Sequence, residues 1–105
     1  MRDPSVIGRR IREARLRAGL SQKQLGINAG IDEFSASPRI NQYEQGKHVP
    51  DLLTAERLAK VLRVPTPFLY AREDGLASWI LAYGNTNTSA RRAILRKIPK
   101  RARPD

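Results

Sequence analysis

A run of polar side chains between residues 35 and 48 contains the groups in this chain that are best suited to recognition chemistry. Arg39, Asn41 and Gln42 lie close together in this run, and hydrophobic side chains are nearly absent from the same side of it. Asparagine and glutamine amides can make paired hydrogen bonds to adenine, and arginine can bind guanine N7 and O6 in the same way. These residue types therefore predict a surface that reads the edges of bases.

A helix over residues 37–45 would position these side chains. Ser37 can cap it, and Pro38 then stands at the first helical position, where its missing N–H costs nothing. Ile40 and Tyr43 form an inward pair, and Gly46 stops the helix. The polar side chains remain on the outside.

A second short helix is predicted just before it, over residues 21–28. Ser21 and Gln24 match the S-x-x-Q capping box, in which each residue satisfies a backbone N–H of the other. Residues 31–37 are interpreted as the connection to the next helix, with Phe34 plugged into the core. Two short helices joined by a turn make a helix-turn-helix unit.

Apolar residues recur at helical spacing through the rest of the chain, so we expect an all-α protein. A first helix ends at Gly19, and a helix capped by Asp51 ends before the Val64–Pro67 break. A further helix covers residues 76–83, a basic helix covers residues 90–98, and disorder is expected from Pro99 onward.

The composition sets the class of partner. The chain has 105 residues, a formal charge of +10 and a pI of about 11.1, so its partner should be polyanionic: nucleic acid first, an anionic membrane surface second. There is no cysteine, which excludes disulfides and thiolate metal sites. With one histidine, no glycine-rich phosphate loop and no clustered carboxylates, the sequence predicts no enzyme, no metal and no cofactor. No apolar stretch approaches the ~20 residues of a membrane span, so a cytoplasmic protein is expected.

Several stretches together resemble the Cro and phage-repressor (XRE) class of helix-turn-helix regulators. They are Arg10 to Arg15, Gly19 to Gln22, Leu25, Gly30-Ile31, Ile40 to Lys47 and Pro50 to Val64. The resemblance implies a lambda-repressor-like five-helix DNA-binding domain over residues 1–72. One or two extra helices would follow over residues 73–98, and a disordered basic tail over residues 99–105.

The resemblance also implies roles for individual residues. Arg15 would pair with Glu44 and fix the angle between the first helix and the recognition helix. Two departures from the family pattern affect base reading: the turn before the recognition helix is about four residues longer, and Pro38 replaces a base-contacting position. Gly26 stands where an alanine is usual and leaves room for closer packing. The expected base contacts are Ser35, Ser37, Arg39, Asn41 and Gln42, and the expected phosphate contacts are Ser21, Gln22, Lys23, Lys47 and His48.

The function implied is a transcriptional regulator, a repressor, bound as a homodimer to a palindromic site in double-stranded DNA. The helix at residues 76–83 either packs on its own domain or contributes to the dimer surface, for which Phe68, Tyr70, Trp79, Ile80 and Tyr83 are candidates. The basic segment Arg91 to Arg103 either follows a phosphate track or is solvated. The alternative function is an antitoxin or adaptor that holds a protein partner with the 76–83 helix and also binds its own promoter.

Overall fold

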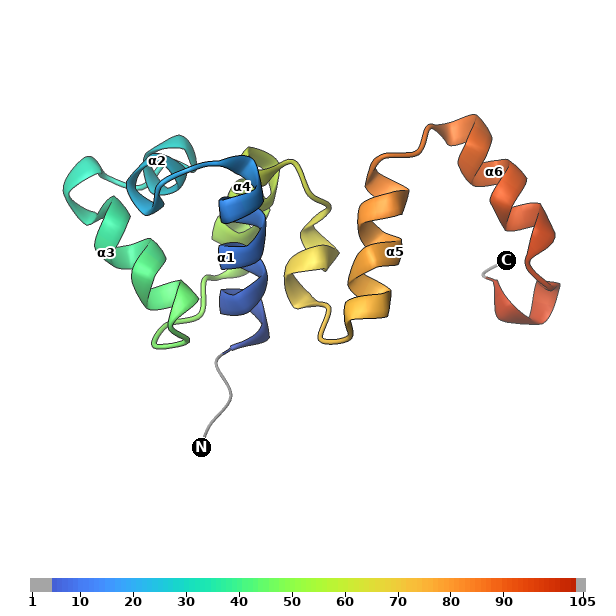
Figure 1. The fold of residues 1–105 in the computed structure, drawn as a ribbon, viewed down its shortest axis with the longest axis horizontal. Helices are drawn as coiled ribbons and strands as arrows, with labels where there is room; N and C mark the ends of the chain where they lie inside the picture. The colour runs from blue at the N-terminus through green and yellow to red at the C-terminus, as the bar shows by residue number, and fades with distance from the viewer. Residues whose placement is uncertain (1–4, 104–105) are drawn as a thin grey trace.

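The structure is a computed structural model that describes residues 5–103, and Figure 1 shows its helices. Within those residues there is no strand, which confirms the prediction of an all-α fold. The elements in chain order are α1 (Val6–Ala18), α2 (Gln22–Asn28), α3 (Glu33–Glu44), α4 (Leu52–Leu62), the 3-10 helix η1 (Thr66–Tyr70), α5 (Asp74–Gly84), α6 (Thr88–Lys97) and the 3-10 helix η2 (Lys100–Ala102). None of the described helices is long and apolar enough to cross a membrane.

Helices α1 to α4 and η1 enclose one hydrophobic core. Their apolar residues follow helical spacing, so each helix turns a single stripe inward. The largest fully buried apolar side chains are Ile11, Leu25, Ile40, Leu58, Phe68 and Leu69. Every one of these helices and η1 therefore contributes at least one residue to the centre of the domain.

Helix α3 begins five residues earlier than the sequence analysis expects. Its N-cap is Asp32, whose Oδ2 accepts a hydrogen bond from the Phe34 N–H at 3.0 Å, and Ser37 lies inside the helix. The extra residues thus lengthen the helix rather than the turn, and the predicted connection over residues 31–37 was wrong. Pro38 stands in the helix interior, where it has no N–H to donate to the Phe34 carbonyl.

Two glycines allow the helices around α3 to approach closely. A Cβ atom on Gly26 would lie 2.7 Å from the Cβ of Ala36, which is closer than real Cβ contacts come. A Cβ on Gly8 would collide with the carbonyl oxygen of Tyr43 near the end of α3. Gly26 in α2 and Gly8 in α1 therefore set how closely α3 is packed.

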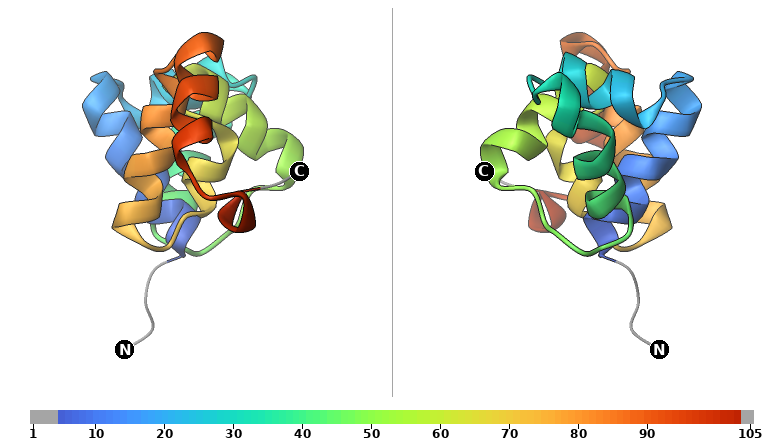
Figure 2. Two further views of the ribbon diagram at one scale, coloured as in Figure 1. Left: turned by 90° about the vertical axis from the view of Figure 1, so that its right-hand side faces the viewer. Right: turned by 90° about the vertical axis from the view of Figure 1, so that its left-hand side faces the viewer.

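Residues 74–103, here called the C-terminal arm, extend away from this domain. Helix α5 packs on η1 and buries Ala77, whereas α6 buries no residue. The molecule measures 49 × 33 × 22 Å, and α3 and α6 lie at opposite ends of its long axis (Figure 1). The two end-on views of Figure 2 agree, because α6 is in front in one and α3 in the other.

Arg10 fastens the arm to α1. The side chain is only 2% exposed, and its guanidinium donates hydrogen bonds to the carbonyls of Ala71 (2.8 Å) and Arg72 (3.2 Å) and to Asp74 Oδ1 (3.0 Å). It also lies over the ring of Phe68, 5.6 Å from its centroid. The structure therefore places Arg10 at the joint between domain and arm.

The segment for which disorder is expected contains η2, and the Arg103 side chain donates a hydrogen bond to the Leu95 carbonyl at 3.0 Å. Residues 104–105 of that expected tail, and residues 1–4 of the expected domain, lie outside the described residues.

Candidate nucleic-acid interface

Helices α2 and α3 form a closely packed pair at one end of the molecule (Figure 1). The predicted capping box at the start of α2 is confirmed. The Gln24 N–H donates to Ser21 Oγ at 3.0 Å, and the Ser21 N–H donates to Gln24 Oε1 at 2.9 Å. The capping box therefore fixes the residue at which α2 begins.

An ion pair between Arg15 and Glu44 braces the other end of α3. Arg15 Nε and Nη2 donate to the two carboxylate oxygens of Glu44 at 2.6 and 3.0 Å, and the side chains are 11% and 2% exposed. The Gln22 amide nitrogen adds hydrogen bonds to Glu44 Oε1 and to Asn41 Oδ1, each 3.2 Å long. One carboxylate thus joins α1, α2 and α3, and bidentate geometry of this kind holds direction as well as distance.

The predicted base-contacting side chains divide between two sides of α3. Ala36, Ile40 and Tyr43 mark the buried side. Since residues three or four apart share a side of a helix, Ser35, Arg39 and Gln42 lie on one flank of it. Ser37 and Asn41 lie on the other flank, which faces α2 because Asn41 accepts the hydrogen bond from Gln22. Arg39 and Asn41 are exposed, and Ser35, Ser37 and Gln42 are half-buried.

Phe34 is the exposed residue that the sequence analysis misplaced. Its side chain is 88% exposed near the start of α3, so the prediction that it plugs the core was wrong. Once Asp32 caps the helix, Phe34 falls in line with Pro38 and Asn41, on the side opposite Ile40. The signal that could have found it is Asp32-Glu33, an N-cap followed by an acidic residue in the first turn.

The turn after α3 holds a second set of polar groups. The N–H groups of Lys47 and His48 both donate to the Gln42 carbonyl, at 2.9 and 3.3 Å. Asp51 then caps α4 by accepting a hydrogen bond from the Thr54 N–H at 2.8 Å. The hydrogen bonds from Thr54 lower the pKa of the exposed Asp51 carboxyl from its ordinary value.

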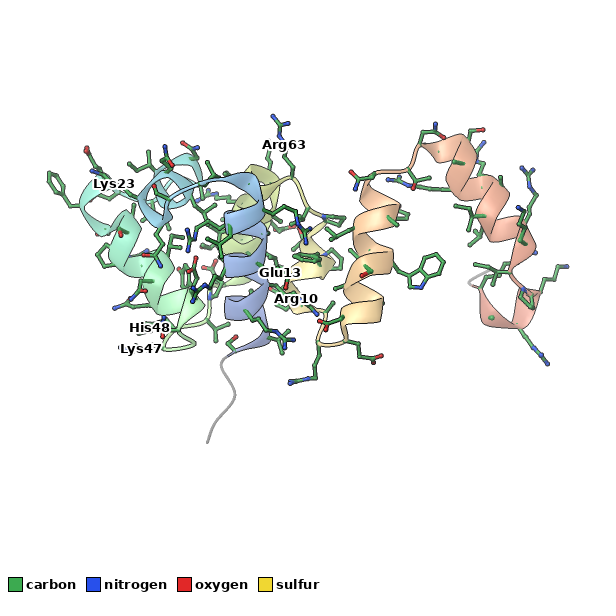
Figure 3. The ribbon with its side chains drawn as sticks, in the orientation of Figure 1. Arg10, Glu13, Lys23, Lys47, His48 and Arg63 are labelled. Carbon is green, nitrogen blue, oxygen red and sulfur yellow. The ribbon has the colours of Figure 1, made fainter. Side chains whose placement is uncertain are left out.

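Cationic side chains flank α3 at both ends. Figure 3 shows Lys23 near the start of α3 and Lys47 with His48 near its end. Lys23 pairs with Glu33 at 3.8 Å, and all three basic residues are exposed. A row of phosphates that runs along α3 would therefore lie near a basic group at each end of the helix. In the described part of the chain, no three His, Cys, Asp or Glu residues are grouped so that they could hold a metal ion.

The residues proposed for dimer contact are not all available. Phe68 is fully buried in the core, so the prediction that it contributes to a dimer surface was wrong. Tyr70, Trp79 and Tyr83 are exposed, and Ile80 is half-buried against the core. Part of α5 therefore packs on its own domain and part of it is exposed, and the dimer surface stays a prediction.

A family model described as a helix-turn-helix domain matches residues 6–67, from the start of α1 into η1. The chain belongs to the helix-turn-helix domain family. This helix-turn-helix protein is also similar to a crystal structure described as that of the transcriptional regulator BswR, with 49% sequence identity and a TM-score of 0.79. The likeness covers 85% of this chain and 88% of BswR. No protein of curated function matches the chain. These findings confirm the resemblance to helix-turn-helix regulators.

Proposed function

We propose that this helix-turn-helix protein is a sequence-specific DNA-binding regulator of transcription that places α3 in the major groove. The observation that carries the proposal is the bracing of α3 by Arg15, Glu44 and Gln22, which holds amide and guanidinium groups in one orientation at one end of the molecule. Rigid presentation matters because paired hydrogen bonds to base edges tolerate little misplacement. The similarity to BswR, itself described as a transcriptional regulator, supports the same function.

The two flanks of α3 would read bases differently. Arg39 and Gln42, with Ser35, would bind guanine and adenine edges, and a good bidentate contact is worth about 1–3 kcal/mol of discrimination. Asn41 would act mainly as an N–H donor, because its Oδ1 already accepts from Gln22. Ser37 lies beside it on the α2 side. Phe34 would contact a thymine methyl group, an apolar contact that an exposed phenyl ring can make.

Phosphate contacts would come from the residues around the ends of the helix pair, namely Ser21, Gln22, Lys23, Lys47 and His48. Binding should then weaken with salt, with a log–log slope of about −0.9 per neutralised phosphate. The basic segment from Arg91 to Arg103 lies at the other end of the long axis from α3, so we expect it to contribute little to this slope.

We further propose that the protein represses transcription as a twofold dimer bound to a palindromic site, with half-sites one helical turn, about 34–36 Å, apart. The arm would supply the contact between copies, since it lies away from α3. The second candidate function is a protein-binding adaptor or antitoxin. Trp79 favours it, because an aromatic side chain that is 71% exposed is a common binding hot spot.

Selection of binding sites from random duplexes, followed by affinity measurements on the selected site, tests the proposal. Arg39→Ala should cost about 1–3 kcal/mol on that site and relax the preference at one base pair. Arg57→Ala, which removes an exposed charge from α4 instead, should preserve the base preference. Recovery of no preferred sequence, or equal base preferences in both variants and the unmodified protein, would refute the assignment of α3.

A further inference from the structure

Two apolar grooves lie on the two sides of α5. The first, here called the arm groove, has a volume of about 480 Å³ and lies between α5 and α6, with Trp79, Tyr83 and Leu95 in its wall. The second, here called the η1–α5 groove, has a volume of about 520 Å³ and is lined by residues that include Leu52, Tyr70, Leu76 and Ile80. Leu52, Tyr70 and Leu76 are each about half exposed or more, so this second groove has an unfilled apolar floor.

Helix α6 is an amphipathic helix that packs only loosely on its own chain, where it forms one wall of the arm groove. It buries no residue, and Ile94 and Leu95 are 45% and 43% exposed. No Asp or Glu occurs between residues 75 and 103. The cations of this segment are Arg91, Arg92, Arg96, Lys97, Lys100, Arg101 and Arg103. Helix α6 thus combines an apolar stripe with charged residues that are all cations.

The η1–α5 groove has the opposite charge. Glu56 is the charged residue in its lining. Asp51 adjoins Leu52 in the sequence, and Glu73 and Asp74 come just before Leu76, although Asp74 is already paired with Arg10. Arg72 is the one cation between residues 64 and 90. An apolar floor with an acidic rim complements an apolar stripe with a basic flank, both in the hydrophobic contact and in the sign of charge.

From this complementarity we propose that the η1–α5 groove receives helix α6 of a second copy of this chain, and that the exchange is reciprocal. The inference rests on the proposed dimer and specifies its contact. The same surfaces would be used twice around a twofold axis, which closes the assembly at two copies. One contact would then cover two exposed features, the helix without buried residues and the groove with an open floor.

The chain's own α6 is held elsewhere. The Arg91 guanidinium lies 3.7 Å from the centroid of the Tyr83 ring and donates two hydrogen bonds to the Tyr83 carbonyl, at 3.0 and 2.6 Å. These contacts keep α6 as one wall of the arm groove, on the Trp79 side of α5. The arm groove is a poor site for the α6 of another copy, because its own charged lining residues, Arg91 and Arg92, are cations that would repel it.

Sedimentation velocity of the full chain tests the apolar part of the contact. Leu76→Asp, in the groove, and Leu95→Asp, on α6, should each weaken self-association at least tenfold. Leu16→Asp on α1 is the matched control, since Leu16 is also an exposed leucine but lies in neither groove. It should leave self-association unchanged. Far-UV circular dichroism checks that each variant remains folded.

A charge exchange between two variants tests the partner assignment itself. Glu56→Lys reverses the groove, and Arg96→Glu/Lys97→Glu reverses the helix, so each variant alone should be mainly monomeric. In a one-to-one mixture both contacts of the mixed dimer regain opposite charges, and dimer should reappear. If the mixture stays monomeric, or if Glu56→Lys alone dimerises as well as the unmodified chain, the proposed contact is wrong.

The outcome for the contact can be separated from the outcome for the proposed function. Base selection by α3 is measured on DNA, and it can succeed whichever surface joins the copies. A dimer that selects a palindrome but shows no charge rescue overturns only the contact proposed here. A chain that remains monomeric both in solution and on DNA overturns the dimer as well.

Discussion

Replacing Glu44 with alanine would leave the Arg15 guanidinium almost buried without its counter-charge. The carboxylate accepts hydrogen bonds from Arg15 at 2.6 and 3.0 Å and from Gln22 at 3.2 Å, and only 2% of its side chain is exposed. Breaking a buried pair from one side costs about 3–5 kcal/mol, because the remaining charge is uncompensated. At about 4–8 °C per kcal/mol for a domain of this size, 3 kcal/mol corresponds to a fall in Tm of roughly 12–24 °C.

The assays are thermal unfolding, which gives the Tm, and urea unfolding, both followed by far-UV circular dichroism. Fluorescence would be a poor probe, because the single tryptophan, Trp79, lies exposed on α5. The control is the double variant Arg15→Met/Glu44→Leu, which replaces both partners with apolar side chains and should be much closer to the unmodified protein. Both variants should bind DNA more weakly, since α3 loses its brace in each. A Glu44→Ala protein as stable as the unmodified chain, or no more destabilised than the double variant, would refute the reasoning.

Three other substitutions test other parts of the structure. Gly26→Ala should destabilise the protein, because overpacking costs about 1–3 kcal/mol and the gain in helix propensity is at most about 1 kcal/mol. The control is Gly75→Ala, whose added Cβ would have no atom within 4 Å, and it should be neutral or stabilising in the same urea titration. Arg10→Met should cost about 1.5–3 kcal/mol for its lost charged hydrogen bonds and speed hydrogen exchange in α5 more than in α2. Hydrogen bonds from Thr54 lower the pKa of Asp51 from its ordinary value of 3.8. The contribution of Asp51 to stability is therefore complete above pH 3.8 and is lost as the pH falls through the lower pKa of the folded state. Asp51→Asn should remove that part of the pH dependence of the urea midpoint, and an unchanged acid profile would contradict it.

The sequence predicts much of the fold because the relevant signals are local. Gly19 ends α1 with a left-handed φ of 72°, and the Ser21 capping box starts α2, both as expected. The inward stripe of Ile40 and Tyr43 is also present. Each of these features depends on residues within one helical turn of each other, which is the range that spacing and capping rules describe.

The features that escaped prediction depend on distant contacts. Asp32 and Ser37 are both good caps, and local rules do not choose between them. An earlier start allows Ala36 to be helical and to pack on Gly26, so a tertiary contact decides the boundary. Arg10 is similar: its spacing of three from Ile7 and four from Ala14 puts it beside the buried stripe of α1, but its partner carbonyl on Ala71 is 61 residues away, so local rules do not show how its charge is satisfied. Phe34 was misplaced for the same reason as the helix start.

Helix α1 carries both Arg10, which binds the start of the arm, and Arg15, which binds α3 through Glu44. One helix is therefore fixed at two points, to the helix that we propose reads a half-site and to the arm that we propose joins two copies. Any tilt of α1 would change both the orientation of α3 and the distance between the two α3 helices of a dimer. The preferred half-site spacing and the preferred base sequence would then both depend on the position of α1. A substitution that removes the contacts of either Arg10 or Arg15 should therefore change both preferences.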